Sequence, residues 1–218
     1  METEYLASME HFVYALFAYQ YDGSGSFSII LNSLNSEECL TLKQVLDTLL
    51  KMNDIYGKIF DYYFEKLKDD YFLLSKRDFA AFVLLKSVKF SKLPSFYNFL
   101  LVCLFMCRLL QSQPECLLLV QIMAKCLIII FTEQYEDFFM ANGGLRGMSK
   151  YFDEIEKEDL RSFAFFHHAN SENEDILIPT FEHVFEIVRE FDECDLMDFD
   201  IGHSELEYLY DYYYPDEE

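Results

Sequence analysis

The stretch from Pro114 to Tyr151, PECLLLVQIMAKCLIIIFTEQYEDFFMANGGLRGMSKY, decides the fold of this chain. Pro114 suits the first position of a helix, because its fixed φ and missing N–H cost nothing there. From Cys116 to Phe131 only Gln121 and Lys125 are strongly polar, and their spacing of four residues places them on one helical face. A helix this apolar is buried over most of its surface. The stretch therefore predicts a helix inside a sizeable helical core.

A glycine break follows this apolar helix. The amphipathic segment Glu133–Met140 leads into Ala141-Asn142-Gly143-Gly144. Glycine readily takes the left-handed conformation that ends many helices. Apolar residues then return at helical spacing from Leu145 to Ile155. We expect one helix to end and another to begin at Gly143 or Gly144.

The same residues resemble a known family. A long apolar helix followed by EDFFMANGGLRGMSKYF resembles the second and third helices of an armadillo-type repeat, over about residues 114–155. The matching residues are Phe138, Phe139, Ala141, Gly143, Gly144, Leu145, Met148 and Phe152. The resemblance implies an all-α fold: an α-solenoid of about four or five armadillo- or HEAT-like units in a right-handed superhelix. The alternative is a compact helical bundle.

A second apolar run, Phe96–Leu110, lies just before the first. It begins after Pro94, and Gln111-Ser112-Gln113 joins it to the next helix as a helical hairpin. Each run has about 15 apolar residues, whereas a membrane span needs about 20, and Arg108 and Lys125 interrupt them. We therefore expect a buried hairpin and no membrane insertion.

Further helices are predicted toward the N-terminus. The first covers Tyr5–Tyr21, with Leu6, Met9, Phe12, Val13, Leu16 and Phe17 facing inward. Ser36 followed by Glu37 and Glu38 indicates an N-cap with acids in the first turn, and Asp54 is a candidate cap for a separate helix after it. Another helix opens at Ser75 or Asp78 and runs to Val88.

The net charge of −22 is concentrated in the last third of the chain. Residues 153–218 contain 22 acids against three bases, a net charge of −19, whereas residues 1–152 contain 17 acids and 14 bases. Such a surface repels nucleic acid and anionic lipid and attracts basic partners. We expect no direct nucleic-acid binding.

Apolar periodicity persists among these acids, so we expect one helical-repeat domain over residues 1–192. Residues 193–218 form an acidic, Tyr-rich segment, with an amphipathic helix predicted near Ser204–Tyr213 and a frayed end after it.

The sequence lacks the spacings of common catalytic and metal sites, having no CxxC pair, GxSxG or GxxxxGK. Cys103 and Cys107 are one helical turn apart, but their apolar neighbours favour packing over metal binding. Asp198 to Gly202 has its glycine one place too early for a calcium loop and lacks the Glu at the twelfth position. No catalytic residue, metal or cofactor is predicted.

Cellular location follows from the cysteines and the N-terminus. Most cysteines fall in apolar runs, and Met1–Glu10 carries three acids and no base, unlike a targeting peptide. A reducing compartment, the cytoplasm or the nucleus, is predicted.

These patterns favour a non-enzymatic scaffold or adaptor that binds a protein or peptide partner, with a Lys/Arg-rich segment as the expected ligand. The candidate partner-binding residues are Asn142, Arg146, Asp198, Asp200, Glu205, Tyr208 and Tyr212. The alternative is a Bcl-2-like or other regulatory bundle that binds a partner's amphipathic helix. The sequence does not fix the oligomeric state.

Overall fold

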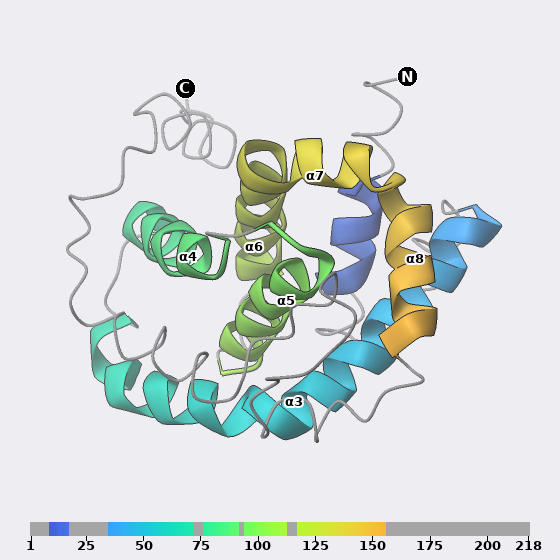
Figure 1. Cartoon of the computed structure of the whole chain (residues 1–218). Coiled ribbons are helices and arrows are strands. Elements are labelled where there is room, and N and C mark those ends of the chain that lie inside the picture. Colours follow the sequence, from blue (N-terminus) through green and yellow to red (C-terminus); the bar gives the residue numbers. More distant parts are fainter. Residues whose placement is uncertain (1–8, 18–34, 72–75, 92–93, 113–116, 156–218) are drawn as a thin grey trace, which may run out of the picture.

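The structure, a computed structural model, describes residues 9–17, 35–71, 76–91, 94–112 and 117–155 (Figure 1). Every regular element within these ranges is helical, which confirms the predicted all-α class for this part of the chain. After a helix of residues 9–17, the elements are α3 Ser36–Tyr71, α4 Lys76–Phe90, α5 Phe96–Gln111, α6 Leu117–Ile130, the π-helical turn η1 Phe131–Tyr135, α7 Glu136–Ala141 and α8 Gly144–Ile155.

Helix α5 lies at the centre of the core and contacts α3, α4 and α6 (Figure 1). Only Asn98, Arg108 and Gln111 of its residues escape burial. The helix starts where the sequence predicts, because Ser95 caps it: the backbone N–H of Asn98 donates to Ser95 Oγ at 3.0 Å. The apolar residues of Phe96–Leu110 occur around the whole helix, so burial on all sides is expected.

Helix α3 is one continuous helix, so the predicted cap at Asp54 is wrong. Asp54 lies exposed in the middle of the helix. Val45, Leu49, Met52, Tyr56 and Phe60 form a buried stripe that runs past this point. Burial of that stripe against the core favours continuing the helix over ending it at a polar residue.

The start of α3 also differs by one residue from the prediction, because Asn35 and not Ser36 is the cap. Asn35 Oδ1 accepts from the backbone N–H groups of Glu37 at 2.9 Å and Glu38 at 3.0 Å. In return, the Asn35 N–H donates to Glu38 Oε2 at 2.7 Å. This reciprocal pair is a capping box, and it satisfies donors that the first helical turn leaves unpaired.

A π-helical turn joins α6 to α7, so the helical path continues through the predicted amphipathic segment. The Glu136 N–H donates to the carbonyl of Phe131, five residues back. Phe131, Tyr135 and Phe139, spaced by four residues through the turn and into α7, are all fully buried. Their ring centroids lie 6.0, 5.3 and 5.2 Å from that of Phe99.

Helix α8 returns to the beginning of the described core and packs beside α3 (Figure 1). Ser149 Oγ donates to Gln44 Oε1 at 2.6 Å, and Gln44 Nε2 donates to Asp153 Oδ1 at 2.9 Å. These bonds join residues more than 100 positions apart. Helix α8, the last described helix, thus packs against α3 near the start of the chain.

The helix of residues 9–17 confirms the inward face predicted for it, since Met9, Phe12, Val13, Leu16 and Phe17 are fully buried. Leu6, the proposed domain boundary at residue 192 and the helix near Ser204–Tyr213 lie outside the described residues. Among the helices in the described ranges, none combines the length and the apolar character that crossing a membrane requires.

Candidate interaction surface

The predicted site residues Asn142 and Arg146 flank the glycine break between α7 and α8, and both are exposed. Asn142 closes α7: its Nδ2 donates to the carbonyl of Phe138 at 2.7 Å, and its backbone N–H also points to that carbonyl. The Arg146 side chain is 89% exposed, with its Nε 3.9 Å from Glu37 Oε1. The Asn142 side chain therefore caps α7, whereas the Arg146 side chain is accessible at the surface.

The other five predicted residues, Asp198, Asp200, Glu205, Tyr208 and Tyr212, lie outside the described residues. Their roles remain predictions from the sequence.

The turn between α7 and α8 depends on its glycines, as the sequence predicts. Gly143 and Gly144 have φ values of 83° and 63°, in the left-handed region that favours glycine. Gly147 is needed for a different reason: a Cβ atom there would lie 1.7 Å from the Asn142 carbonyl oxygen. The glycines thus let the end of α7 approach α8 closely and set the direction of the exposed face of α7.

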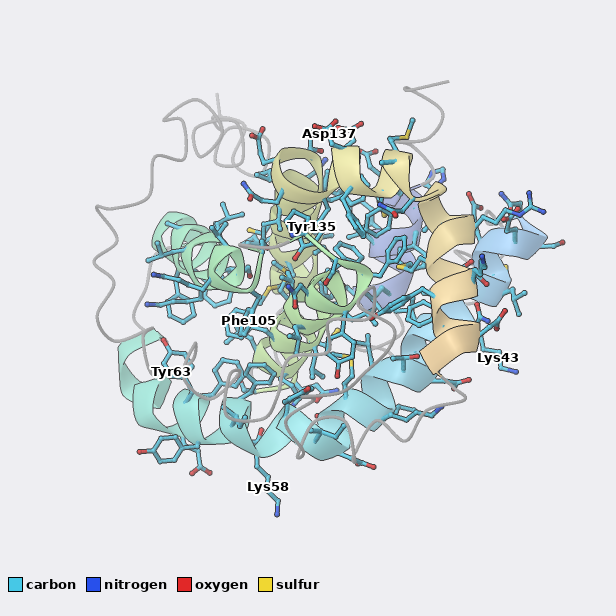
Figure 2. The ribbon with its side chains drawn as sticks, viewed as in Figure 1. Lys43, Lys58, Tyr63, Phe105, Tyr135 and Asp137 are labelled. Carbon is cyan, nitrogen blue, oxygen red and sulfur yellow. The ribbon has the colours of Figure 1, made fainter. Side chains whose placement is uncertain are left out.

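Three acids on η1 and α7 form what we call the acidic ridge: Glu133, Glu136 and Asp137. Glu133 and Asp137 are exposed and Glu136 is half-buried. Figure 2 shows Asp137 pointing out from the end of the molecule opposite α3. Within the described ranges no ion pair joins these carboxylates to a base. The ridge is thus a small anionic surface.

Met140 lies next to the acidic ridge and is 51% exposed, one of four large apolar side chains that are exposed in the described part of the chain. It is three residues after Asp137, so the two share a helical face. An apolar side chain beside acids offers both contact area and charge to a basic ligand. Our sequence reasoning missed this ridge; its signal was the segment EQYEDFFM, with three acids and no base.

An aromatic cluster supports the ridge from below. The Phe96 ring lies 5.0 Å from Phe138, 4.9 Å from Phe139 and 5.5 Å from Tyr151, measured between centroids. These rings join the start of α5 to α7 and α8. Edge-to-face and tilted pairs of this kind add to the apolar burial, so the ridge sits on a packed base.

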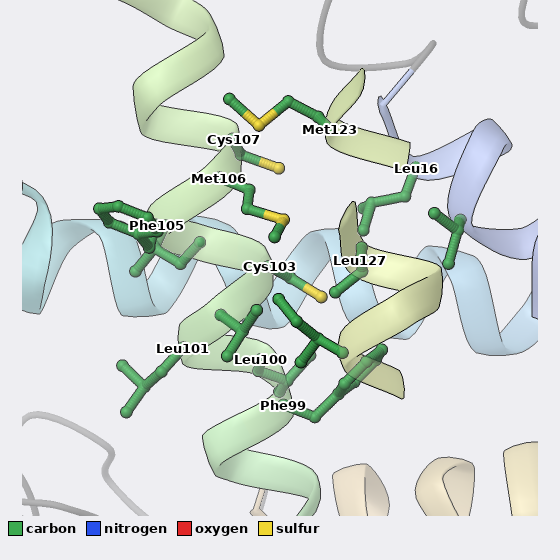
Figure 3. Packing of buried hydrophobic residues seen from close by; sticks show 14 of the residues in the cluster. Leu16, Phe99, Leu100, Leu101, Cys103, Phe105, Met106, Cys107, Met123 and Leu127 are labelled. Carbon is green, nitrogen blue, oxygen red and sulfur yellow. The ribbon is translucent and has the colours of Figure 1, made fainter. Parts of the chain in front are cut away.

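The cysteine thiols, which are candidate nucleophiles and metal ligands, lie inside the core. Cys103 and Cys107 are fully or almost fully buried on α5, and Figure 3 shows them among Met106, Met123 and Leu127 at the contact with α6. Burial raises the pKa of Cys107 to about 12, and burial, reinforced by the neighbouring Cys107, raises the pKa of Cys103 well above its usual value. A thiol in that state is a poor nucleophile and a poor metal ligand. Nowhere in the described ranges do three or more metal-ligating side chains gather.

Two tyrosines form a buried polar contact between α3 and α5. The hydroxyls of Tyr56 and Tyr97 lie 3.1 Å apart, and both side chains are fully buried. Burial raises the pKa of Tyr56 to about 12, an effect partly offset by the Tyr97 hydrogen bond. One hydroxyl donates to the other, so a single buried hydrogen bond joins the two helices.

Comparison of this chain with protein-family profiles, with curated proteins and with solved structures gives no match.

Proposed function

We propose that this chain is a non-enzymatic interaction module that binds a basic protein or peptide segment, with the acidic ridge as one of its contact surfaces. The observation that carries the proposal is the ridge itself. Glu133, Glu136 and Asp137 lie beside exposed Met140, on a helix supported by packed aromatic rings. Such a surface attracts Lys and Arg side chains and positions them next to an apolar anchor.

The charge of the remaining chain supports the same choice of partner. Residues 153–218 carry a net charge of −19, which adds a long-range attraction for cations beyond the ridge. We propose that this acidic third captures a Lys/Arg-rich segment that the ridge then contacts at close range. A nuclear or cytoplasmic protein with such a segment is the proposed partner.

We also propose that the described helices form a compact bundle and not an open solenoid. In a solenoid each unit contacts its neighbours in the sequence. The contact between α8 and α3, through Gln44, Ser149 and Asp153, joins distant parts of the chain and favours the bundle. Small-angle scattering tests this: a compact scattering profile supports the bundle, and an elongated, curved one supports the armadillo-like solenoid.

An experiment on the proposed function is affinity purification from the native host at low salt. The bait is compared with a triple variant of the ridge, Glu133→Gln, Glu136→Gln and Asp137→Asn. The matched control removes the same number of charges from α3, with Asp47→Asn, Asp54→Asn and Glu65→Gln; all three residues are exposed. We expect a basic protein to be retained by the bait and by the control and to be lost from the ridge variant.

A truncation ending at Glu158 separates the two acidic regions. If the ridge makes the close contact, a folded truncated chain still retains the partner, with lower affinity because the long-range attraction is weaker. Complete loss of the partner from the truncation, together with full retention by the ridge variant, assigns binding to the acidic third instead and contradicts a role for the ridge.

A second candidate is a regulatory bundle that binds an amphipathic helix of its partner, as Bcl-2-like proteins do. The observation that favours it is the central helix α5, buried among α3, α4 and α6. The salt dependence of the affinity distinguishes the two candidates. An amphipathic helix binds mainly by apolar contact, so its affinity changes little with salt, whereas the affinity of a basic segment falls.

A further inference from the structure

We propose that the segment of residues 180–191 docks on the outer face of α4 within the same chain. This outer face is the stripe of α4 at helical positions i, i+3, i+4 and i+7, formed by Phe82, Leu85, Lys86 and Lys89. Ala80, whose carbonyl is 3.9 Å from Cys126 Sγ of α6, occupies the opposite face. Figure 1 shows α5 and α6 together on one side of α4.

The outer face of α4 is covered. Leu85 and Lys86 are each only 5% exposed, and Phe82 beside them is also buried. Among the described helices, α4 packs mainly against α5 and α6, which cover its other side. Leu85 does not belong to the contiguous buried apolar cluster that the other described side chains form. We therefore infer that a further segment of the chain lies over this face.

The burial of Lys86 requires that the covering segment brings an acid, because a buried ammonium group is stable only when it is paired. Lys86 Nζ lies 5.8 Å from the centre of the Phe82 ring, and Lys86 and Lys89 both have further interactions within the chain. The positions three and four residues from Lys86 on α4 hold Phe82, Val83, Lys89 and Phe90. No carboxylate of its own helix is therefore a neighbour of Lys86, and the acid comes from another segment.

Charge identifies the last part of the chain as the source of that acid. Residues 156–218 hold 20 acids, whereas the other ranges outside the described residues hold four: Glu2, Glu4, Asp22 and Glu115. Residues 79–91 together with α6 carry three lysines and no acid, Lys86, Lys89 and Lys125. This part of the surface is thus basic in a strongly acidic chain, and it attracts residues 156–218 more than any other segment.

Within that part of the chain, residues 180–191 fit the outer face of α4 best. They follow Pro179, and their apolar residues recur at helical spacing: Phe181, Val184, Phe185 and Val188. A row of acids, Glu182, Glu186 and Glu190, runs along one flank of this stripe at four-residue spacing. The apolar stripe matches Phe82 and Leu85, and the acids match Lys86 and Lys89.

The chain is long enough to make this contact. The 24 residues from 156 to 179 join the end of α8 to the docking segment. Fully extended, they span up to about 80 Å, which exceeds the diameter of about 40 Å expected for a domain of this size. The contact forms without a partner, so its test does not depend on the proposed function.

The first test measures how fast each lysine of the full chain is acetylated by a limiting amount of an N-hydroxysuccinimide ester, read by mass spectrometry. We expect Lys86 to react at least about tenfold more slowly than Lys58, which is exposed on α3. The variant Phe181→Ser, Phe185→Ser removes the apolar stripe of the docking segment, and Lys86 should then react nearly as fast as Lys58. The control Phe163→Ser, Phe165→Ser removes two rings before the segment and should leave Lys86 protected. Circular dichroism verifies that both variants keep their helix content. Equal rates for Lys86 in the two variants overturn the proposal.

The second test uses the unmodified chain, so it does not depend on the folding of a variant. A carbodiimide joins an amine directly to a carboxylate that it contacts, and we expect it to join Lys86 or Lys89 to an acid of the docking segment: Glu182, Glu186 or Glu190. An equal mixture of unlabelled chain and chain labelled with nitrogen-15 shows whether the two residues belong to one molecule. Cross-links of mixed isotope composition assign the cover to a second copy and overturn the proposal. So do cross-links from these lysines only to other acids, such as Glu2 or Glu4, or no cross-link from them at all.

Discussion

Helices α5 and α3 lie in opposite environments: α5 is buried almost throughout, whereas α3 exposes one charged face. Helix α5 has 16 residues and is buried almost throughout, so its thiols and its tyrosine hydroxyl are shielded from solvent and from reaction. Helix α3 has 36 residues and buries one stripe while exposing a charged face. The groups with the most strongly raised pKa values therefore lie in the core, whereas the described surface of α3 carries ordinary charged side chains.

The largest difference is expected from removing an aromatic ring on each helix. Phe99 on α5 is fully buried at the centre of three aromatic rings, so we expect Phe99→Ala to lower the free energy of unfolding by about 4 kcal/mol. Tyr62 on α3 is 66% exposed, and Tyr62→Ala is expected to cost less than about 0.5 kcal/mol. Urea denaturation of both variants measures the contrast. Similar losses would mean that α5 is not the centre of the core.

The next-largest loss in the free energy of unfolding is expected from a substitution at the glycine break. Gly147→Ala forces a Cβ against the Asn142 carbonyl, so α7 and α8 must move apart. We expect a loss of about 2 kcal/mol in the free energy of unfolding. Lys150→Ala, at an exposed position of the same helix, is the control and is expected to be nearly neutral. If Gly147→Ala is also neutral, the two helices do not approach as closely as described.

The tyrosine pair tests how α5 and α3 are aligned. Tyr97→Phe removes the hydrogen bond between the two buried hydroxyls, and we expect a loss of about 1 to 2 kcal/mol in the free energy of unfolding. The double variant Tyr56→Phe with Tyr97→Phe removes both hydroxyls, so part of that loss should return. A double-mutant cycle from thermal unfolding measures the coupling, and strictly additive losses would show that the hydroxyls do not interact.

Alkaline pH should weaken the core through its thiols. Burial raises the pKa of Cys107 from 9.0 to about 12, so above pH 9 the unfolded chain loses a proton that the folded chain keeps. The stabilising effect is complete below pH 9 and is lost as the pH rises toward 12, at about 1 kcal/mol per pH unit for this thiol. Unfolding measured from pH 8 to pH 11 should show a shallower fall for Cys107→Ala. Equal slopes would place the thiol in contact with solvent.

Local patterns predicted the parts of the fold that depend on local chemistry. The apolar runs gave the positions of α5 and α6, and Gly143 and Gly144 gave the turn before α8. The continuity of α3 past Asp54 was missed because burial of Met52 and Tyr56 outweighs a local capping signal. The contact of Gln44 with Ser149 was missed because no local pattern reports on residues so far apart.

Prediction of the site was less complete. Arg146 lies on the exposed surface, and its predicted role in binding stays a prediction, whereas the amide of Asn142 caps α7. The acidic ridge was overlooked because its charges are few beside those of the last third. Its acids lie on the segment whose Tyr135 and Phe139 are buried, and the apolar pattern of the sequence did not reveal the π-helical turn there.

The most direct measurement is the salt dependence of binding between the purified full chain and the basic protein that the proposed affinity purification is expected to recover. The affinity is determined at about 0.05 M and about 0.5 M salt, for the unmodified chain and for the variant Glu133→Gln, Glu136→Gln, Asp137→Asn. We predict that the variant binds about tenfold more weakly at low salt and loses less affinity as salt is added. Equal affinity and an equal salt dependence for the two proteins would contradict a role for the acidic ridge in binding.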